Sequence, residues 1–528
     1  MSESSSTTQL ASRIAVLVHE HFDALPARSK PTIFPDGSRE WIPMTGIVAV
    51  KGENTASESL HCIAITQTPR SGAKCLSASH MPRCRGLVLH DCHAEILAIR
   101  AFNYWLLTEC HGLMSQEIAE IKGTPPQSPF IRRRDVKQGE KSSLASLDWP
   151  PFELQPDVKL YMYCTCAPCG DGSMELCMAS QEDATPWEVK RDTKQDPEIQ
   201  EGAAAAEHDL LDGRAHFSLL GIVRRKPART DAESTRSKSC SDKLALKQVS
   251  SLLSWQAAKL VIPTENAYLA GLILPEDEIS NIACERAFGE NGRMKDLKGR
   301  SWGGETTESS YGYRFRPFEI LAVSAKETET RWKFSKPKST PLPENAESTE
   351  NVTTPKKSKP GSASAVWTFA PTHSHTCDVL LNTGSKQLPS LRRSKTGLHE
   401  TIIAGVKQGH KISTAVARGA SALSRARLWA LLQSLQALES KIHDSRKLST
   451  QQADAAKDDE AHKEAHPHHH NAMTYKDQKE AHSESFNPLR VREEAIRDAR
   501  DVLKGWSRNV GDENWGLDVL IDPKKRKR

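Results

Sequence analysis

Three short segments carry residue types that can bind a metal ion and move protons. They are HAE at 93–95, PCG at 168–170 and SCSDK at 239–243. A catalytic zinc site takes three protein ligands from His and Cys and keeps a fourth position for water. The metal lowers the pKa of that water, and a nearby carboxylate can take its proton and pass it to a leaving group. We therefore expect His93, Cys169 and Cys240 to be zinc ligands and Glu95 to be the proton carrier.

Each segment taken alone also has a plainer interpretation. The pattern His-x-Glu occurs three times in the chain, and only the first copy lies at a predicted junction between elements. Cys166 and Cys169 form a CxxC that can be a redox pair, or with Cys164 part of a structural zinc site. Cys240 can be an ordinary buried cysteine. The presence of all three segments in order, each at a strand end or a helix start, favours the catalytic metal site.

The elements that would position these residues alternate along the chain. Short β-branched runs predict strands at 41–50, 60–67, 158–164, 215–223 and 267–275. Apolar runs without Pro or Gly inside predict helices at 93–109, 171–179 and 241–259. Both cysteines thus fall at predicted helix starts, where the helix dipole favours a thiolate. The fold class is α/β, with helices against a sheet and a mostly helical last third near 421–440 and 489–507.

Polar, low-complexity composition divides the rest of the chain. Four stretches are too polar to form a core and are predicted to be disordered insertions: 113–156, 183–213, 330–365 and 440–472. The 528 residues could hold several domains on length alone. With these insertions set aside, we expect an N-terminal segment at 1–30, one domain at 31–520 and a basic tail at 521–528.

Composition and charge narrow the function class. The first residues, MSESSSTTQL, lack the features of a signal peptide, and no window approaches the ~20 apolar residues of a membrane span. The 12 cysteines of such an intracellular chain suggest metal binding or reduced thiols. A net charge of +5 is mild, but the basic runs RRKPAR at 224–229 and KKRKR at the C-terminus suit nucleic acid. We expect Arg224, Arg225 and Lys226 to contact RNA, with solvated surface charge as the alternative.

The spacing of the cysteines separates two kinds of zinc deaminase. The common signature has its two cysteines close together, as PCxxC. Here Pro168 and Cys169 are followed by Gly172 where the second cysteine would stand. The remaining cysteine ligand must come from far downstream, which argues against the cytidine-deaminase branch.

Four longer runs resemble one known family. They are DCHAEILAIR at 91–100, APCGD at 167–171, RRKPART at 224–230 and SKSCSDKLALKQ at 237–248. The chain resembles the eukaryotic tRNA-specific adenosine deaminase 1 family and, more widely, the catalytic domain of the adenosine deaminases that act on double-stranded RNA. The similarity runs from 41–43 to 503–509. It implies a cytidine-deaminase-like core, a mixed sheet with helices on both faces. It also implies a zinc enzyme that converts the adenosine 3′ of the anticodon of tRNA-Ala to inosine by hydrolysis.

The resemblance also assigns binding residues. It gives the same zinc ligands and proton carrier as above, and places Lys74 beside the RNA backbone near the flipped base. The wider family buries an inositol hexakisphosphate under its active site. The matching positions are Arg100, Lys243, Lys395, Tyr475, Lys479 and Trp506. The chain departs from the double-stranded-RNA enzymes at Ile99, Leu246 and Lys247, which puts individual phosphate contacts in doubt.

The partner is expected to be tRNA, with no membrane and a monomeric chain favoured. About 40 residues precede the first predicted strand, too few for a separate RNA-binding domain. A base in an unstacked loop also enters a pocket at lower cost than a paired one. Alternatives are a noncatalytic RNA-binding protein with structural zinc, a deaminase of double-stranded RNA, or a redox protein using Cys166 and Cys169. The tail DPKKRKR favours the nucleus, with a tRNA contact as the alternative.

Overall fold

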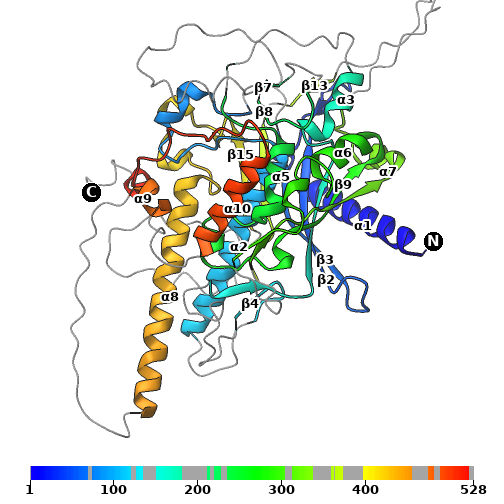
Figure 1. Ribbon diagram of the computed structural model, residues 1–528. Helices are drawn as coiled ribbons and strands as arrows, with labels where there is room; N and C mark the ends of the chain where they lie inside the picture. The colour runs from blue at the N-terminus through cyan, green and yellow to red at the C-terminus, as the bar shows by residue number, and fades with distance from the viewer. Residues whose placement is uncertain are drawn as a thin grey trace, which may run out of the picture.

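One eight-stranded mixed sheet forms the centre of the fold (Figure 1). Its strands are β2 (Met44–Lys51), β3 (Ser59–Gln67), β6 (Val158–Cys164), β9 (Leu269–Pro275), β12 (Glu319–Val323), β14 (Ser364–Thr368), β15 (His399–Ile403) and β16 (Val406–Lys407). They lie in the order β12-β9-β6-β2-β3-β14-β15-β16. The strands β6, β9 and β12 run parallel, and the other neighbouring pairs are antiparallel. The sheet therefore joins a parallel half to an antiparallel half at β2.

The computed structural model describes residues 2–68, 74–119, 127–134, 150–180, 211–213, 219–226, 233, 235–303, 312–336, 358–361, 363–372, 397–454, 474–480 and 488–521. Short strand pairs flank the main sheet: β1 (Glu40–Trp41) with β13 (Lys359–Pro360), β4 (Ile131–Arg133) with β5 (Phe152–Leu154), β7 (Leu211–Asp212) with β8 (Arg224–Arg225), and β10 (Ser301–Trp302) with β11 (Tyr313–Arg314).

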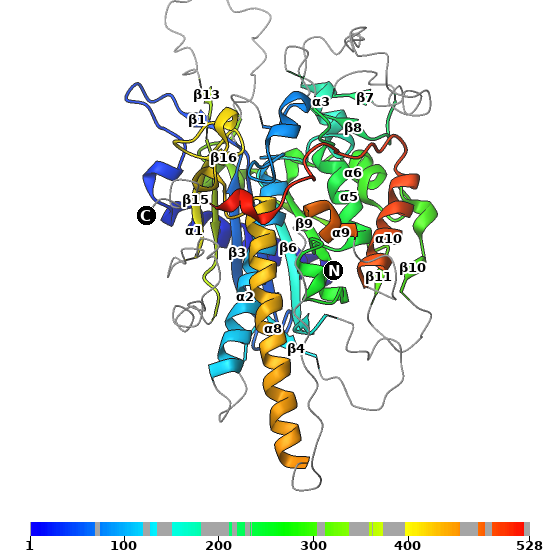
Figure 2. The same ribbon diagram turned by 90° about the vertical axis from the view of Figure 1, so that its left-hand side faces the viewer.

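Helices cover both faces of the sheet. They are α1 (Ser2–Ala24), α2 (Ala94–Ala119), α3 (Met174–Ala179), α5 (Cys240–Ser250), α6 (Asn281–Phe288), α7 (Ala325–Arg331), α8 (Arg425–Asp454), α9 (Tyr475–Glu480) and α10 (Pro488–Val502). Helix α1 lies on one side, and α2, with α8 beside it, lies on the other (Figures 1 and 2).

The residues of β2 show why both faces are buried. Side chains alternate between the two faces of a strand. Ile47 and Ala49 belong to the core around α2 and α8, whereas Val48 and Val50 belong to the core under α1. At Gly46 an added Cβ would lie only 2.6 Å from Cγ2 of Val18 on α1. Helix α1 therefore sits so close that glycine is required beneath it.

Several predicted elements are confirmed and two are wrong. Strand β6 has the predicted bounds, and α2 begins as predicted but runs ten residues further, to Ala119. Residues 219–223 form no strand, and residues 215–218 lie outside the described part. The helix predicted at 241–259 ends at Ser250, because Ser251 takes a φ of 56° that a right-handed helix does not allow.

The structure also corrects the predicted insertions. Helix α8 continues to Asp454, inside the stretch 440–472 that was expected to be disordered. The stretch 113–156 supplies the end of α2 and both strands of the β4–β5 pair. The segment 1–30 is largely helix α1, and it packs into the core of the sheet.

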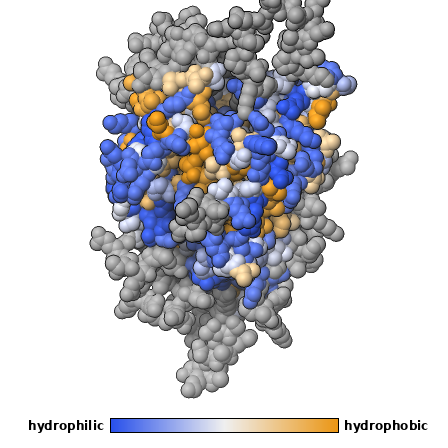
Figure 3. All heavy atoms as spheres, turned by 90° about the vertical axis from the view of Figure 1, so that its right-hand side faces the viewer, coloured by the Kyte–Doolittle hydropathy of each residue, from blue (hydrophilic) through white to orange (hydrophobic). Residues whose placement is uncertain are grey.

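The surface carries mixed polarity. Seen from the right-hand side of Figure 1, apolar residues lie in patches among hydrophilic ones (Figure 3). The most exposed large apolar side chains among the described residues are Ile33 and Ile282. Single exposed side chains of this kind are common on monomers. Among the described helices, none has the length and apolar content needed to cross a membrane.

Candidate active site and metal centre

Three junctions between elements meet at one place. His93 directly precedes α2, Cys169 lies in the turn after β6, and Cys240 is the first residue of α5. The start of α5 is fixed by Ser239, whose hydroxyl accepts a hydrogen bond from the backbone N–H of Asp242. Because helix starts leave N–H groups unpaired and carry a partial positive charge, they suit negatively charged ligands such as thiolates.

Cys169 and Cys240 contact each other. The backbone N–H of Cys240 donates to Sγ of Cys169 over 3.4 Å. A hydrogen bond from the Cys240 thiol, with the positive charges of Lys226 and His93, holds the pKa of Cys169 well below its usual range although burial opposes this. His93 also hydrogen-bonds Cys169. Cys169 thus contacts both Cys240 and His93, and the zinc-ligand roles predicted for these three residues stay a prediction.

Asp91 orients the imidazole of His93. Its Oδ1 lies 2.7 Å from Nδ1 of His93 and also accepts the backbone N–H of His93 over 3.0 Å. A carboxylate on one ring nitrogen fixes the tautomer and leaves the other nitrogen for a metal. Nε2 of His93 is therefore the ring nitrogen that remains for a metal.

A second group of possible ligands shares the same histidine. The ligand atoms of Cys75, Asp91 and His93 all lie within 4.8 Å of one another, and Cys75 Sγ is 3.8 Å from Nδ1 of His93. However, Oδ2 of Asp91 already accepts hydrogen bonds from Lys226, at 3.0 Å, and from Lys243. Both oxygens of Asp91 are engaged, so this carboxylate is better placed to orient than to coordinate.

A line of charged groups links Asp91 to Cys240. Nζ of Lys226 lies 3.0 Å from Oδ2 of Asp91 and 3.3 Å from Sγ of Cys240. Although burial alone would raise the pKa of Asp91, the charges of Lys226 and Lys243 hold it well below its usual range. Ser237 adds a further hydrogen bond to the same oxygen at 2.9 Å. Lys226, Lys243 and Ser237 thus hold Asp91 in place through hydrogen bonds and ion pairs, on one side of the site.

Glu95 lies in the first turn of α2, beside these groups. It is buried, and its pKa is raised by burial and by the negative charge of Cys169. A carboxyl group with a raised pKa holds and releases protons near neutral pH more readily than an exposed one. Its position and chemistry suit a proton carrier.

The predicted RNA contacts divide into two groups. Arg224 and Lys226 are only 1% and 5% exposed, and both make internal hydrogen bonds. Their burial argues against the predicted RNA contacts, which were inferred from the basic run RRKPAR alone. Arg225 is half-buried, and Lys74 lies at the edge of the site, where its carbonyl accepts the N–H of Cys92. For these two the RNA role stays a prediction.

A cation cluster lies under α2, α5 and α10. We define it as the half-buried residues Arg100, Lys247, Arg425, Arg492 and Arg500. Burial, with repulsion from Arg425, lowers the pKa of Arg100 to about 10, and burial with repulsion from Arg508 and Arg492 lowers that of Arg500 to about 10. Burial and Arg492 lower the pKa of Lys247 well below its usual range.

Two atoms of the cation cluster point to an anionic ligand. Nε of Arg492 and Nε of Arg500 are buried and have no hydrogen-bond partner among the described residues. Gathering like charges in a poorly hydrated place is costly unless an anion neutralises them. The donor set fits a polyphosphate, which offers many acceptor oxygens.

Only some of the residues predicted to hold inositol hexakisphosphate lie at this cluster. Arg100 is a member, Lys479 is near Arg425 and Arg500, and the ring of Trp506 lies 5.7 Å from the guanidinium of Arg500. Tyr475 is buried and its hydroxyl accepts a hydrogen bond from Trp255. Lys243 instead binds Asp91, and Lys395 lies outside the described residues.

Four cluster members were not predicted as ligands: Lys247, Arg425, Arg492 and Arg500. The run RVREEAIRDAR did hold a signal, because Arg492 and Arg500 are eight positions apart and so share one face of α10.

Comparison with known proteins identifies the family of this chain. Residues 70–399 match the adenosine-deaminase (editase) domain family. The chain is 34% identical over 327 residues to tRNA-specific adenosine deaminase 1 of Schizosaccharomyces pombe, covering 61% of this chain and 69% of that protein. It is 30% identical to the Saccharomyces cerevisiae protein of the same name, covering 52% and 61%. It is 27% identical to rat double-stranded RNA-specific editase B2, covering 44% of this chain and 26% of that protein. The chain therefore belongs to the adenosine-deaminase (editase) domain family of enzymes.

Proposed function

We propose that this chain converts adenosine to inosine in tRNA by hydrolysis, using one zinc ion held by His93, Cys169 and Cys240. The observation that carries the proposal is a chain of contacts beside the buried Glu95. Cys240 contacts Cys169, and Lys226 joins Sγ of Cys240 to Asp91, the carboxylate that orients His93. We also propose that the mixed sheet with helices on both faces is a cytidine-deaminase-like core.

The donor set fits zinc. One imidazole and two thiolates are the ligand types of catalytic zinc sites, which leave one coordination position open. Bound zinc supplies Lewis acidity, which lowers the pKa of water at the open position. Asp91 fixes the ring of His93, and Lys226 donates a hydrogen bond to Sγ of Cys240. The charge of Lys226 opposes the burial and the neighbouring Cys169 that otherwise raise the pKa of Cys240. These supports favour this ligand set over Cys75, Asp91 and His93.

Glu95 would perform the proton transfers. Its carboxylate takes a proton from the attacking water and passes protons to the purine ring and to the departing amino group, which leaves as ammonia. The overall change is adenosine plus water to inosine plus ammonia. Because Glu95 is buried beside the two cysteines, bulk water does not compete for these protons.

We propose tRNA-Ala as substrate, modified at the adenosine 3′ of the anticodon. The two yeast relatives named for tRNA are more similar to this chain, and match more of it, than the rat editase named for double-stranded RNA. We expect the purified protein to form inosine in a tRNA-Ala transcript and at least about 100-fold less in a duplex of equal length, because unpairing a base costs a few kcal/mol.

Mass spectrometry of nuclease digests measures the inosine at each position. A transcript with guanosine at the target position is the matched control. Greater product from the duplex would favour a double-stranded-RNA deaminase. Zinc-loaded protein that binds tRNA but forms no inosine would favour the noncatalytic RNA-binding alternative.

We propose that the cation cluster holds inositol hexakisphosphate. We expect acid-denatured protein to release about one such molecule per chain, and Arg492→Met to lose it, since Arg492 has an unpaired buried Nε. A ligand held at 100 to 1,000 times its Kd adds about 3–4 kcal/mol of stability, so Arg492→Met should unfold at a clearly lower temperature.

The control for this variant is Arg490→Met, because Arg490 is an exposed residue on the same helix, paired with Glu494. Phosphate analysis and thermal unfolding check both variants. Equal phosphate in Arg492→Met and wild type would contradict the assignment. The C-terminal DPKKRKR lies outside the described residues, and we keep nuclear localisation as a proposal for it.

A further inference from the structure

Each of the two cysteines is followed, two positions later, by a buried aspartate. The sequences are Cys169-Gly170-Asp171 and Cys240-Ser241-Asp242. The side chains of Asp171 and Asp242 are fully buried. Neither belongs to the site as described above, so their burial requires a separate physical reason.

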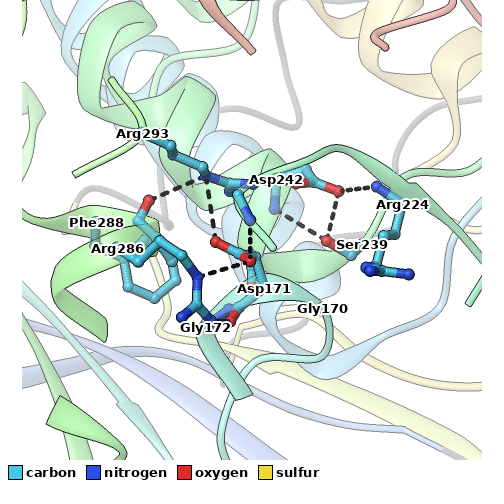
Figure 4. Close-up of polar contacts among 12 residues, drawn as sticks. Gly170, Asp171, Gly172, Arg224, Ser239, Asp242, Arg286, Phe288 and Arg293 are labelled. Carbon is cyan, nitrogen blue, oxygen red and sulfur yellow. Dashed lines mark hydrogen bonds and ion pairs between the residues drawn. The ribbon is translucent and has the colours of Figure 1, made fainter. Parts of the chain in front are cut away.

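Arg293 lies between these two carboxylates (Figure 4). Its Nη1 donates to Oδ1 of Asp242 over 2.6 Å, whereas its Nε approaches Oδ2 of Asp171 to 4.0 Å, an ion pair without a hydrogen bond. Arg286 also binds Asp171, at 3.0 Å, but its other ion pair is to Glu175. Of the two arginines, Arg293 is the one that joins both cysteine-bearing segments.

Arg293 is itself held in place. Its side chain is only 4% exposed, and its Nε donates to the carbonyl of Ala287 over 3.3 Å. The turn before it depends on Gly292, because an added Cβ would lie 2.3 Å from the carbonyl oxygen of Glu285. The guanidinium therefore has a defined position set by α6 and the turn that follows it.

The two segments that Arg293 joins are already in close contact. The backbone N–H of Ser241 donates to the carbonyl of Cys169 over 3.0 Å, and the Ser241 hydroxyl donates to that of Pro168 over 3.1 Å. Gly170 has a φ of 108°, and an added Cβ would lie 2.2 Å from Oγ of Ser239. A small relative shift of the segments would therefore change the separation of the sulfurs.

We propose that Arg293 is a positioning residue that fixes the separation of Cys169 and Cys240 by bridging Asp171 and Asp242. The inference rests on the proposed zinc site, since the two sulfurs matter as ligands of one metal. The guanidinium is planar and rigid and can reach two carboxylates at once, whereas a lysine ammonium is a single point charge. Removing the bridge would loosen the paired sulfurs while leaving the ligands themselves intact.

The test compares Arg293→Lys with Arg133→Lys in the full-length protein. Arg133 is a matched control, because it bridges Glu117 and Glu439 on α2 and α8, at 2.8 Å each, away from the cysteines. We expect zinc-loaded Arg293→Lys to lose zinc to a chelator about 10–100-fold faster than wild type, the range for residues that support metal ligands. Arg133→Lys should release zinc at the wild-type rate.

Cobalt substitution gives a readout that a general loss of stability would not change. The absorption of the cobalt–thiolate bonds should shift in Arg293→Lys and stay unchanged in Arg133→Lys. If Arg293→Lys does not fold, Asp242→Asn, which keeps the side-chain volume, should show the same two effects. Wild-type zinc release and an unshifted cobalt spectrum in the folded variant would overturn the inference. Wild-type protein that binds no zinc would instead overturn the proposed function.

Discussion

Replacing Glu95 by Gln should lower the rate of inosine formation by about 10²–10⁴-fold, the usual contribution of a general acid–base group. Glutamine has nearly the same shape but cannot accept and release a proton. Because Glu95 is not among the proposed zinc ligands, the zinc content should stay at the wild-type level. Single-turnover formation of inosine in tRNA-Ala, with metal analysis of the same sample, measures both quantities.

Glu109→Gln is the matched control for this variant. Glu109 is also buried, lies on the same helix α2, and accepts hydrogen bonds from Ser128 and Thr372 far from the cysteines. It should lose some stability but keep its catalytic rate. Activity of Glu95→Gln within tenfold of wild type would remove Glu95 from its proton-carrying role.

Replacing Cys240 by Ser should abolish zinc binding and lower activity by more than about 100-fold, which is the upper range for residues that only support ligands. A serine hydroxyl is a far poorer zinc ligand than a thiolate. The loss also leaves Lys226 without the sulfur that its ammonium group contacts at 3.3 Å. Metal content and inosine formation should therefore fall together.

Cys62→Ala is the control, because Cys62 is buried in β3 on the face under α1. It should keep both zinc and activity. If Cys240→Ser still held one zinc per chain, the group of Cys75, Asp91 and His93 would become the metal site. Cys75→Ser should then lose the metal.

Much of the candidate site could be predicted because its possible metal ligands and proton carrier lie in short sequence motifs. The segments around His93, Cys169 and Cys240 lie at the ends of elements whose apolar periodicity is strong, such as β6 and α2. Where the sequence signal for an element was weaker, tertiary contacts determined where that element ends. The helix that begins at Cys240 stops at Ser250, and the chain then turns so that the N–H of Leu252 bonds the carbonyl of Ala267.

The supporting residues could be predicted less well. Asp91 had a local signal, since a carboxylate two positions before a ligand histidine can reach its ring. Lys226 was predicted to contact RNA, because its burial depends on strands and helices distant in sequence and leaves no local signal. Arg293 acts on Asp171 and Asp242 only through the folded arrangement of α5 and α6. The spacing of residues along the sequence does not predict such a contact.

The position of helix α1 has a consequence for shortened forms of the chain. Its residues cover Met44, Val48, Ile65 and Tyr163 on one face of the sheet. Deleting the first 24 residues would expose a large part of that face to water, as an apolar patch of the kind that drives self-association. A truncated protein would then keep every proposed metal-binding and acid–base residue and still precipitate. The reason is that helix α1 buries one apolar face of the central sheet.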